Sequence, residues 1–352
     1  MTAMIFRAAA LAALSLMSAQ VRAQTPSIPA MHWYRGNTHT HTLNSDGDTP
    51  PYEVARWYRE HGYQFLFITD HEYLTDPAPL NALIGASNRF LLLPGQEITQ
   101  WSDDPRHPSA HVNALFTHDV IWPMGVRRCI GAGCGAKVPA DVPLAETFRT
   151  NIAAVLAQHG IVQINHPNYR WSVQPEDLAD IPDRSLLEIW NGLGVNNRGG
   201  DNGAGDVRLS TEGYWDWLLS RGKIVWGVGS DDSHSMESRG QAWIVVRAPE
   251  LTAAALRAAI ERGQFYASNG VTIRDIDQQD QGLTIHIDGD DEGPRFTTRF
   301  IGQGGRVLAE VAGLNPSYRF TGSETYVRAV IVDSNGRQAW IQPEFRDSRR
   351  RR

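Results

Sequence analysis

The sequence predicts an α/β fold, a barrel built on a parallel sheet, followed by a small antiparallel β domain. The chain has 352 residues, which exceeds a single barrel of roughly 250 residues by enough for an appendage. Short apolar runs that look like buried strands alternate with helical patterns from residue 33 to about residue 246. After Gly270 the pattern changes to alternating strands separated by turns. A doubly wound sheet stays open as an alternative to the barrel.

The first 23 residues read as a secretory signal peptide. Arg7 precedes an apolar run from Ala8 to Met17, and Val21-Arg22-Ala23 has the small-x-small form of a cleavage site. An apolar run of about 10 residues is shorter than the roughly 20 that span a bilayer. We therefore expect an exported protein, periplasmic or secreted, without a membrane anchor after cleavage.

The barrel is predicted over residues 24–270. Its strands are the apolar runs that end in polar residues, namely 64–71, 89–97, 111–118, 160–167, 185–192, 223–234 and 241–248. The clearest helical patterns are residues 51–61, 144–159 and 251–262. In most of these runs the chemically capable residues follow the strand, where barrel enzymes place their sites.

The β domain, sandwich-like, is predicted over residues 271–345. Ser334-Asn335-Gly336 is a strong hairpin signal within it, and no group of ligand-type residues falls there. Residues 346–352 form a basic tail.

Charge argues against nucleic-acid binding. Removal of the signal peptide takes away two arginines and no acid, so 31 basic residues face 39 acidic residues in the mature chain. Binding to a phosphate backbone needs clustered basic side chains, and the chain has only the basic run at its end. A small-molecule substrate is expected; the oligomeric state cannot be derived.

Two cysteines, Cys129 and Cys134, lie in a Gly-rich stretch. In an exported protein a disulfide is the favoured interpretation. A zinc knuckle would need two further Cys or His ligands nearby, and none lies within 20 residues on the C-terminal side.

Nine residues with imidazole or carboxylate groups stand mostly at strand ends. His39 and His41 form a His-x-His pair, whose imidazoles share one side of an extended segment. Ionisable groups that close apolar strands are difficult to explain by packing. The nine candidates for metal ligands are His39, His41, Asp46, His71, Glu97, His111, His166, Asp232 and His234.

Two assignments leave alternatives open. His107 and His118 compete with His111, and Asp231 competes with Asp232. Under a period of two, only Asp232 shares a strand face with His234.

These motifs resemble the polymerase and histidinol phosphatase (PHP) superfamily. The motifs that carry the resemblance are His39-Thr40-His41 with Ser45-Asp46-Gly47, Thr69-Asp70-His71, Glu97, Asn165-His166-Pro167 and Asp232-Ser233-His234. The run Gly263–Gly270 and the β domain also resemble exported PHP proteins of the carbaryl-hydrolase type, which is a less specific likeness.

The resemblance implies a distorted (β/α)7 barrel of the TIM type and a site for two or three metal ions. One ion would take His39, His41, Glu97 and Asp232. A second ion would share Glu97 and take His111 and His166, and a third would take Asp46, His71 and His234. Two departures from the commonest PHP pattern are the extra acid Asp231 and the long loop over residues 105–140.

Mixed imidazole and carboxylate ligands favour zinc or manganese, with iron as a further choice. Such ions make a bound hydroxide available for hydrolysis. Asp232 and His234 are the candidates for proton transfer. The candidates for substrate binding are Arg170, Asn191, Arg198 and Arg239.

A phosphomonoester or phosphodiester is the leading substrate hypothesis, because three cations can neutralise phosphate oxygens and the PHP resemblance implies this activity. The carbaryl-type resemblance implies a carboxylic or carbamate ester instead. Amidohydrolases bridge their metals with a carboxylated lysine, but Lys137 lies in a loop and Lys223 precedes its strand. A non-enzymatic secreted binding module is the remaining class, and the nine-residue ligand set argues against it.

Overall fold

The computed structural model describes residues 30–85, 89–126, 137–201, 207–279, 282–290 and 292–346. The predicted signal peptide, both cysteines and the basic tail after Arg346 lie outside these residues. Within them, no helix has the length and apolar character needed to cross a membrane.

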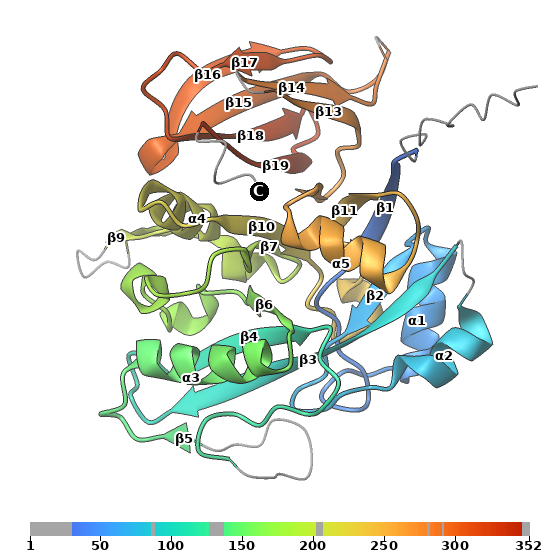
Figure 1. The fold of residues 1–352 in the computed structure, drawn as a ribbon, viewed down its shortest axis with the longest axis vertical. Helices are drawn as coiled ribbons and strands as arrows, with labels where there is room; N and C mark the ends of the chain where they lie inside the picture. Colours follow the sequence, from blue (N-terminus) through green and yellow to red (C-terminus); the bar gives the residue numbers. More distant parts are fainter. Residues whose placement is uncertain are drawn as a thin grey trace, which may run out of the picture. The chain divides into compact units, whose positions relative to one another are not determined.

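A large mixed sheet of 14 strands organises the chain (Figure 1). Its strands pair in the order β10-β7-β6-β4-β3-β2-β1-β11-β12-β19-β18-β15-β16, with β5 beside β3. The first part of the sheet contains β1 (His32–Asn37), β2 (Phe65–Ile68), β3 (Leu91–Ser102), β4 (Ser109–Leu115), β5 (Lys137–Val138), β6 (Ile161–Ile164), β7 (Ser185–Asn191), β10 (Val225–Ser230), β11 (Trp243–Ala248) and β12 (Phe265–Ser268). Each predicted apolar strand is therefore present. β8 (Gly200–Asp201) and β9 (Val207–Arg208) form a separate pair.

The sheet is mixed, which corrects the expectation of a purely parallel one. β1, β2 and β3 run parallel, as do β6, β7 and β10. β4 runs antiparallel to both β3 and β6. A reversed strand presents its beginning at the edge where its parallel neighbours end. His111, near the start of β4, thus reaches the same edge as residues that follow the other strands.

Main-chain hydrogen bonds join the segments that follow β1 and β10, two strands that do not pair with each other. Thr40 and Ser233, which follow β1 and β10, form an isolated parallel bridge. The His41 amide donates to the Ser233 carbonyl at 2.9 Å, and the Asp232 amide donates to the His39 carbonyl at 3.0 Å. The described strands do not pair into a closed barrel, so the (β/α)7 barrel stays a prediction.

The described residues contain five α-helices, and three of them match the predicted helical patterns. The helices are α1 (Pro51–Glu60), α2 (Pro77–Ile84), α3 (Leu144–Ala157), α4 (Thr211–Ser220) and α5 (Ala253–Glu261). Residues from α3, α4 and α5 share one apolar core with the strands, and residues from α1 and α2 share another with β2. Ser210 and Thr252 cap the N-termini of α4 and α5 with their hydroxyl oxygens.

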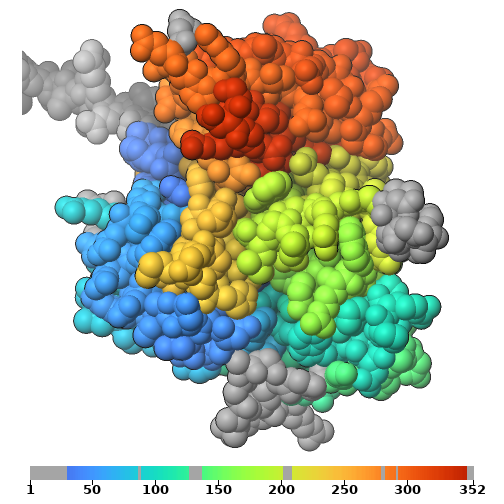
Figure 2. All heavy atoms as spheres, turned by 180° about the vertical axis from the view of Figure 1, so that it is seen from behind, coloured from blue at the N-terminus to red at the C-terminus, as the bar shows by residue number. Residues whose placement is uncertain are grey.

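The C-terminal strands form a second layer of antiparallel structure and lie together in one block, orange to red in Figure 2. They are β13 (Ile273–Gln279), β14 (Gly282–Ile287), β15 (Phe296–Gly302), β16 (Arg306–Ala312), β17 (Ser317–Arg319), β18 (Tyr326–Asp333) and β19 (Gln338–Phe345). β13, β14 and β17 form a separate sheet, while β19 joins the large sheet through β12. A second apolar core contains residues of these C-terminal strands together with Val245 of β11 and Tyr266 of β12. The predicted hairpin is present between β18 and β19, where Gly336 has φ 82°.

Candidate metal centre

The fold brings all nine predicted ligands together at one edge of the large sheet. Most follow a strand directly or closely, whereas Glu97 and His111 lie within the paired strands β3 and β4. Their donor atoms form four overlapping groups, each with all its donors within 4.8 Å of one another. The groups are His39–His41–Glu97, His39–His166–Asp232, Glu97–His111–His166 and His41–Asp46–His71–His234.

The donors implied for the first ion lie close to the two imidazoles of the His-x-His pair. His39 Nε2 lies 3.1 Å from His41 Nε2 and 3.2 Å from both Glu97 Oε2 and Asp232 Oδ1. His41 Nε2 lies 3.3 Å from each of the same two oxygens. Neutral imidazole nitrogens and carboxylate oxygens gathered at such short separations are the donors that zinc and similar divalent ions take. The residues present therefore fit a divalent ion.

Glu97 also reaches the second donor set with its other oxygen. Glu97 Oε1 lies 3.0 Å from His111 Nδ1 and 3.5 Å from His166 Nε2. His111 Nε2 is buried and has no hydrogen-bond partner among the described residues, so this imidazole has bonding capacity in reserve. The two oxygens of Glu97 thus face two different donor sets, as a bridging carboxylate requires.

The third donor set is more open to solvent. Asp46 Oδ2 lies 3.4 Å from both His71 Nε2 and His234 Nε2, and Asp46 Oδ1 lies 3.4 Å from His41 Nδ1. The Asp46 side chain is 46% exposed and that of His234 is 33% exposed, against 1% for Glu97. A substrate can therefore approach from the Asp46 and His234 side.

Attraction between imidazoles and carboxylates determines the direction of the pKa shifts of His39, Glu97 and Asp232. Burial opposes the charged forms, but nearby imidazoles outweigh it and hold the pKa of Glu97 and Asp232 well below the usual range. Burial likewise opposes protonation of His39, yet the carboxylates of Asp232, Glu97 and Glu188 raise its pKa well above 6.5. Divalent cations would take the place of these protons, because metal binding requires neutral imidazole and ionised carboxylate.

A buried carboxylate that the sequence reasoning missed orients the first donor set. Glu188 Oε1 lies 3.0 Å from His39 Nδ1, and its Oε2 accepts from the His166 amide at 2.7 Å. Such a carboxylate fixes the tautomer of a ligating imidazole and raises its basicity. The available signal was an acid inside the apolar run SLLEIWN, where packing alone does not explain a charge.

Asp70, which lies in the quoted Thr69-Asp70-His71 motif, holds the ligand loop in place. Its Oδ1 accepts from the Thr42 amide and the Ser45 hydroxyl, each at 2.7 Å. Its Oδ2 accepts from the Thr42 hydroxyl at 2.7 Å. This carboxylate therefore fixes the backbone that places His41 and Asp46.

The structure separates the roles of the two adjacent acids Asp231 and Asp232. Asp231 accepts hydrogen bonds from the amides of Gly240, Gln241 and Ala242 and from the Tyr58 hydroxyl, at 2.6–2.9 Å. Burial raises its pKa to about 6, against these hydrogen bonds that lower it. Asp232 alone joins the donor set. Its φ of 51° is uncommon for a residue other than glycine.

We predict opposite effects for amide substitutions at these two positions. Asp231→Asn places an NH2 group against N–H and O–H donors, so it should cost about 2–3 kcal/mol of unfolding free energy. Folded Asp231→Asn protein should keep its metal content. Asp232→Asn should lose at least one equivalent of metal. Urea unfolding with chelator and elemental analysis measure both, and exchanged phenotypes would reverse the assignment.

The competing histidines lie outside the four groups. His107 Nδ1 is 2.6 Å from the carbonyl oxygen of Ser172, and His118 is exposed beside Asp119. Of the three competing histidines, His111 is therefore the one that contacts Glu97.

The four residues predicted to bind substrate divide into two exposed and two buried ones. Arg170 and Arg198 are exposed. Asn191 is fully buried and donates to Asp232 Oδ2 at 3.0 Å and to Glu188 Oε2 at 2.9 Å. Arg239 has a side chain only 2% exposed, 3.9 Å from Asp48. Asn191 therefore positions Asp232, and burial speaks against substrate contact by Arg239.

Neither lysine can bridge the cluster. Lys137 pairs with Asp103 at 3.4 Å, and Lys223 Nζ donates to the Ile181 carbonyl at 2.9 Å. The chain has no third lysine, so a carboxylated lysine of the amidohydrolase kind is excluded from this site.

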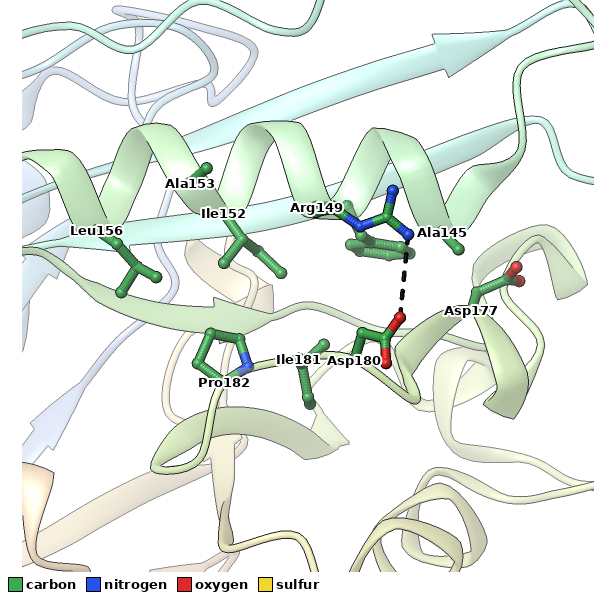
Figure 3. A pocket seen from close by; sticks show the side chains of 10 residues that line it. Ala145, Arg149, Ile152, Ala153, Leu156, Asp177, Asp180, Ile181 and Pro182 are labelled. Atoms are coloured by element: carbon green, nitrogen blue, oxygen red, sulfur yellow. Dashed lines mark ion pairs between the residues drawn. The ribbon is translucent and has the colours of Figure 1, made fainter.

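An apolar pocket of about 180 Å³ lies apart from the cluster, between α3 and the segment before β7. Figure 3 shows Ile152 and Leu156 of α3 facing Ile181 and Pro182, with an ion pair of 3.9 Å between Arg149 and Asp180. Its lining contains none of the nine predicted ligands.

Comparison with known proteins leaves the family unassigned. No family model matches the sequence, and no curated protein matches it. Among solved structures, the chain resembles a two-domain protein from Bacteroides vulgatus that contains a predicted PHP-like metal-dependent phosphoesterase. The TM-score is 0.49 at 15% identity, over 89% of this chain and 93% of the other.

It also resembles an amidohydrolase from Chromobacterium violaceum, with a TM-score of 0.36 at 16% identity over 57% and 88% of the two chains. A third similarity is to a lesion-specific endonuclease from Pyrococcus furiosus, with a TM-score of 0.39 at 12% identity over 65% and 56%. At these values the similarities establish neither the family nor an activity.

Proposed function

We propose that the chain is a metal-dependent hydrolase of the PHP type, and that it cleaves phosphomonoesters or phosphodiesters. The observation that carries this proposal is the bridging position of Glu97 between two donor sets, with a third set beside them. Such adjacent cation sites suit phosphate oxygens, whose charge several cations can neutralise together.

We propose two or three divalent ions, zinc or manganese, because every group mixes imidazole with carboxylate. When bound, these ions would lower the pKa of water toward neutrality and polarise the substrate. The residues of the chain hold this arrangement rigid: Glu188 orients His39, and Asn191 orients Asp232.

His234 is the candidate for proton transfer, together with Asp232. His234 Nδ1 lies 2.9 Å from the Asp232 carbonyl oxygen, which leaves Nε2 facing Asp46 at the solvent-exposed side. With two ions bound and the third donor set empty, an imidazole in this place can donate a proton to a leaving group that departs toward solvent.

The first test measures metal and turnover together. We expect protein loaded with manganese or zinc to retain two or three equivalents by elemental analysis, and under one equivalent would contradict the proposal. We expect it to cleave p-nitrophenyl phosphate or bis-p-nitrophenyl phosphate and to lose this activity with chelator. Cleavage of p-nitrophenyl acetate or an aryl carbamate alone would replace the phosphoester by the alternative ester class. Metal retention without any turnover would favour the binding module.

Export is the second part of the proposal, with signal cleavage after Ala23 and a disulfide between Cys129 and Cys134. We expect no free thiol when the exported protein is titrated under denaturing, non-reducing conditions. Two free thiols would contradict the disulfide.

A further inference from the structure

Two aromatic side chains, Trp101 and Tyr169, form a wall beside His111 and His166 of the candidate metal centre. Because side chains alternate along a strand, Glu97, Thr99 and Trp101 share one face of β3, and Trp101 lies farthest along it. The Trp101 ring is 5.8 Å from the His111 ring at an interplanar angle of 83°. Tyr169 lies 5.6 Å from His111 and 5.4 Å from His166, again between ring centroids. Both rings are partly exposed.

Arg170 lies over these rings without an acidic partner. Its Cζ is 5.6 Å from the Trp101 ring centroid and 5.3 Å from that of Tyr169. Among the residues that the structure describes, no carboxylate pairs with its guanidinium, and the residue is exposed. A guanidinium held against aromatic faces at the rim of a cationic centre is available for an anion and for stacking.

The backbone that presents this wall is held in an uncommon conformation. Arg170 and Trp171 have φ values of 53° and 55°, which cost of order 1–3 kcal/mol each for residues other than glycine. Arg208 Nη1 donates to the Trp171 carbonyl at 2.9 Å, and His107 Nδ1 lies 2.6 Å from the Ser172 carbonyl oxygen. The surrounding contacts thus keep Arg170 turned toward Trp101.

We propose that Trp101, Tyr169 and Arg170 form a subsite for a planar aromatic group of the substrate, so that aryl phosphoesters bind in preference to alkyl phosphoesters. The phosphoester part of this inference rests on the proposed function. The aromatic part rests on the two rings, because a planar group gains more than an alkyl chain from stacking on them. Arg170 would pair with the negative charge of the bound ester.

The test compares a ligand that carries an aromatic ring with one that carries a short alkyl chain. Calorimetry on metal-loaded protein measures Kd for benzylphosphonate and for propylphosphonate, neither of which can be hydrolysed. We expect benzylphosphonate to bind about tenfold tighter. Trp101→Ala should reduce this ratio to near one, whereas Trp101→Phe should keep most of it. Arg170→Ala should weaken both ligands and keep the ratio.

Tyr73→Ala is the matched control, since Tyr73 is an exposed aromatic residue two positions after His71 and is not one of the three subsite residues. It should leave the ratio unchanged. Metal content should be normal in every variant, because none removes a ligand. If neither phosphonate binds, the phosphoester proposal fails, and the ratio is then measured with phenylacetate and pentanoate. A wild-type ratio near one, or an unchanged ratio in Trp101→Ala, overturns the subsite.

Discussion

Glu97→Gln is expected to lower kcat by roughly a thousandfold or more, on the order of 4 kcal/mol, and to reduce the metal content by at least one equivalent. Glu97 is 1% exposed, and its two oxygens lie 3.0–3.3 Å from His39, His41, His71 and His111. Glutamine offers one carbonyl oxygen and no charge, so it cannot serve two cations or offset their repulsion. Both donor sets should weaken together.

His111→Ala is the comparison for this result, because His111 contacts Glu97 through only one oxygen and belongs to one donor group. We expect it to strip one ion and leave the other set loaded. Circular dichroism should show both variants folded. Full metal content and near-normal turnover in Glu97→Gln would contradict the bridging assignment. The acids nearest in sequence could not take over, since Asp103 pairs with Lys137 and Asp104 with Arg106.

The nine candidate ligands could be selected from the sequence because each is an ionisable residue in or beside an apolar strand. Burying an imidazolium or carboxylate at such a position costs free energy unless it has a partner of opposite charge or a cation. The shared edge of the sheet brings these groups together, so that each has such a partner. His71 after β2 and His166 after β6 are examples. The sequence pattern does not indicate that β4 runs antiparallel to β3 and β6, because strand direction depends on pairing between distant segments. It is this reversal that brings His111 opposite Thr99, beside the other ligands.

The residues that position the candidate ligands were harder to predict than the candidate ligands themselves. Glu188 and Asn191 lie on the same strand, and only the structure shows that Glu188 contacts His39 and that Asn191 contacts Asp232. The helix α4 was also missed, although Ser210 caps it, because its sequence TEGYWDWLLS mixes acids and aromatic residues. The structure explains its acids Glu212 and Asp216, because both form ion pairs with Arg328 of β18.

Arg328→Met is expected to lower the unfolding free energy by about 3–5 kcal/mol, because it leaves a buried carboxylate unpaired. The Arg328 side chain on β18 is 2% exposed and donates to Asp216 Oδ1 at 2.8 Å and Oδ2 at 2.7 Å. Its Nη1 also donates to Glu212 at 3.1 Å. These bonds tie the C-terminal strands to α4, so their loss should destabilise both.

Urea unfolding of the chelated protein measures this effect without a contribution from metal binding. Combining Arg328→Met with Asp216→Leu should recover most of the loss, since a buried ion pair and an apolar pair of similar volume differ little in free energy. Arg56→Ala is the control for loss of an ion pair in general: Arg56 and Glu60 are 52% and 62% exposed, and their pair should contribute under about 1 kcal/mol. If Arg328→Met costs no more than Arg56→Ala, water must reach Asp216, and the link between β18 and α4 is not the buried ionic contact that these distances describe.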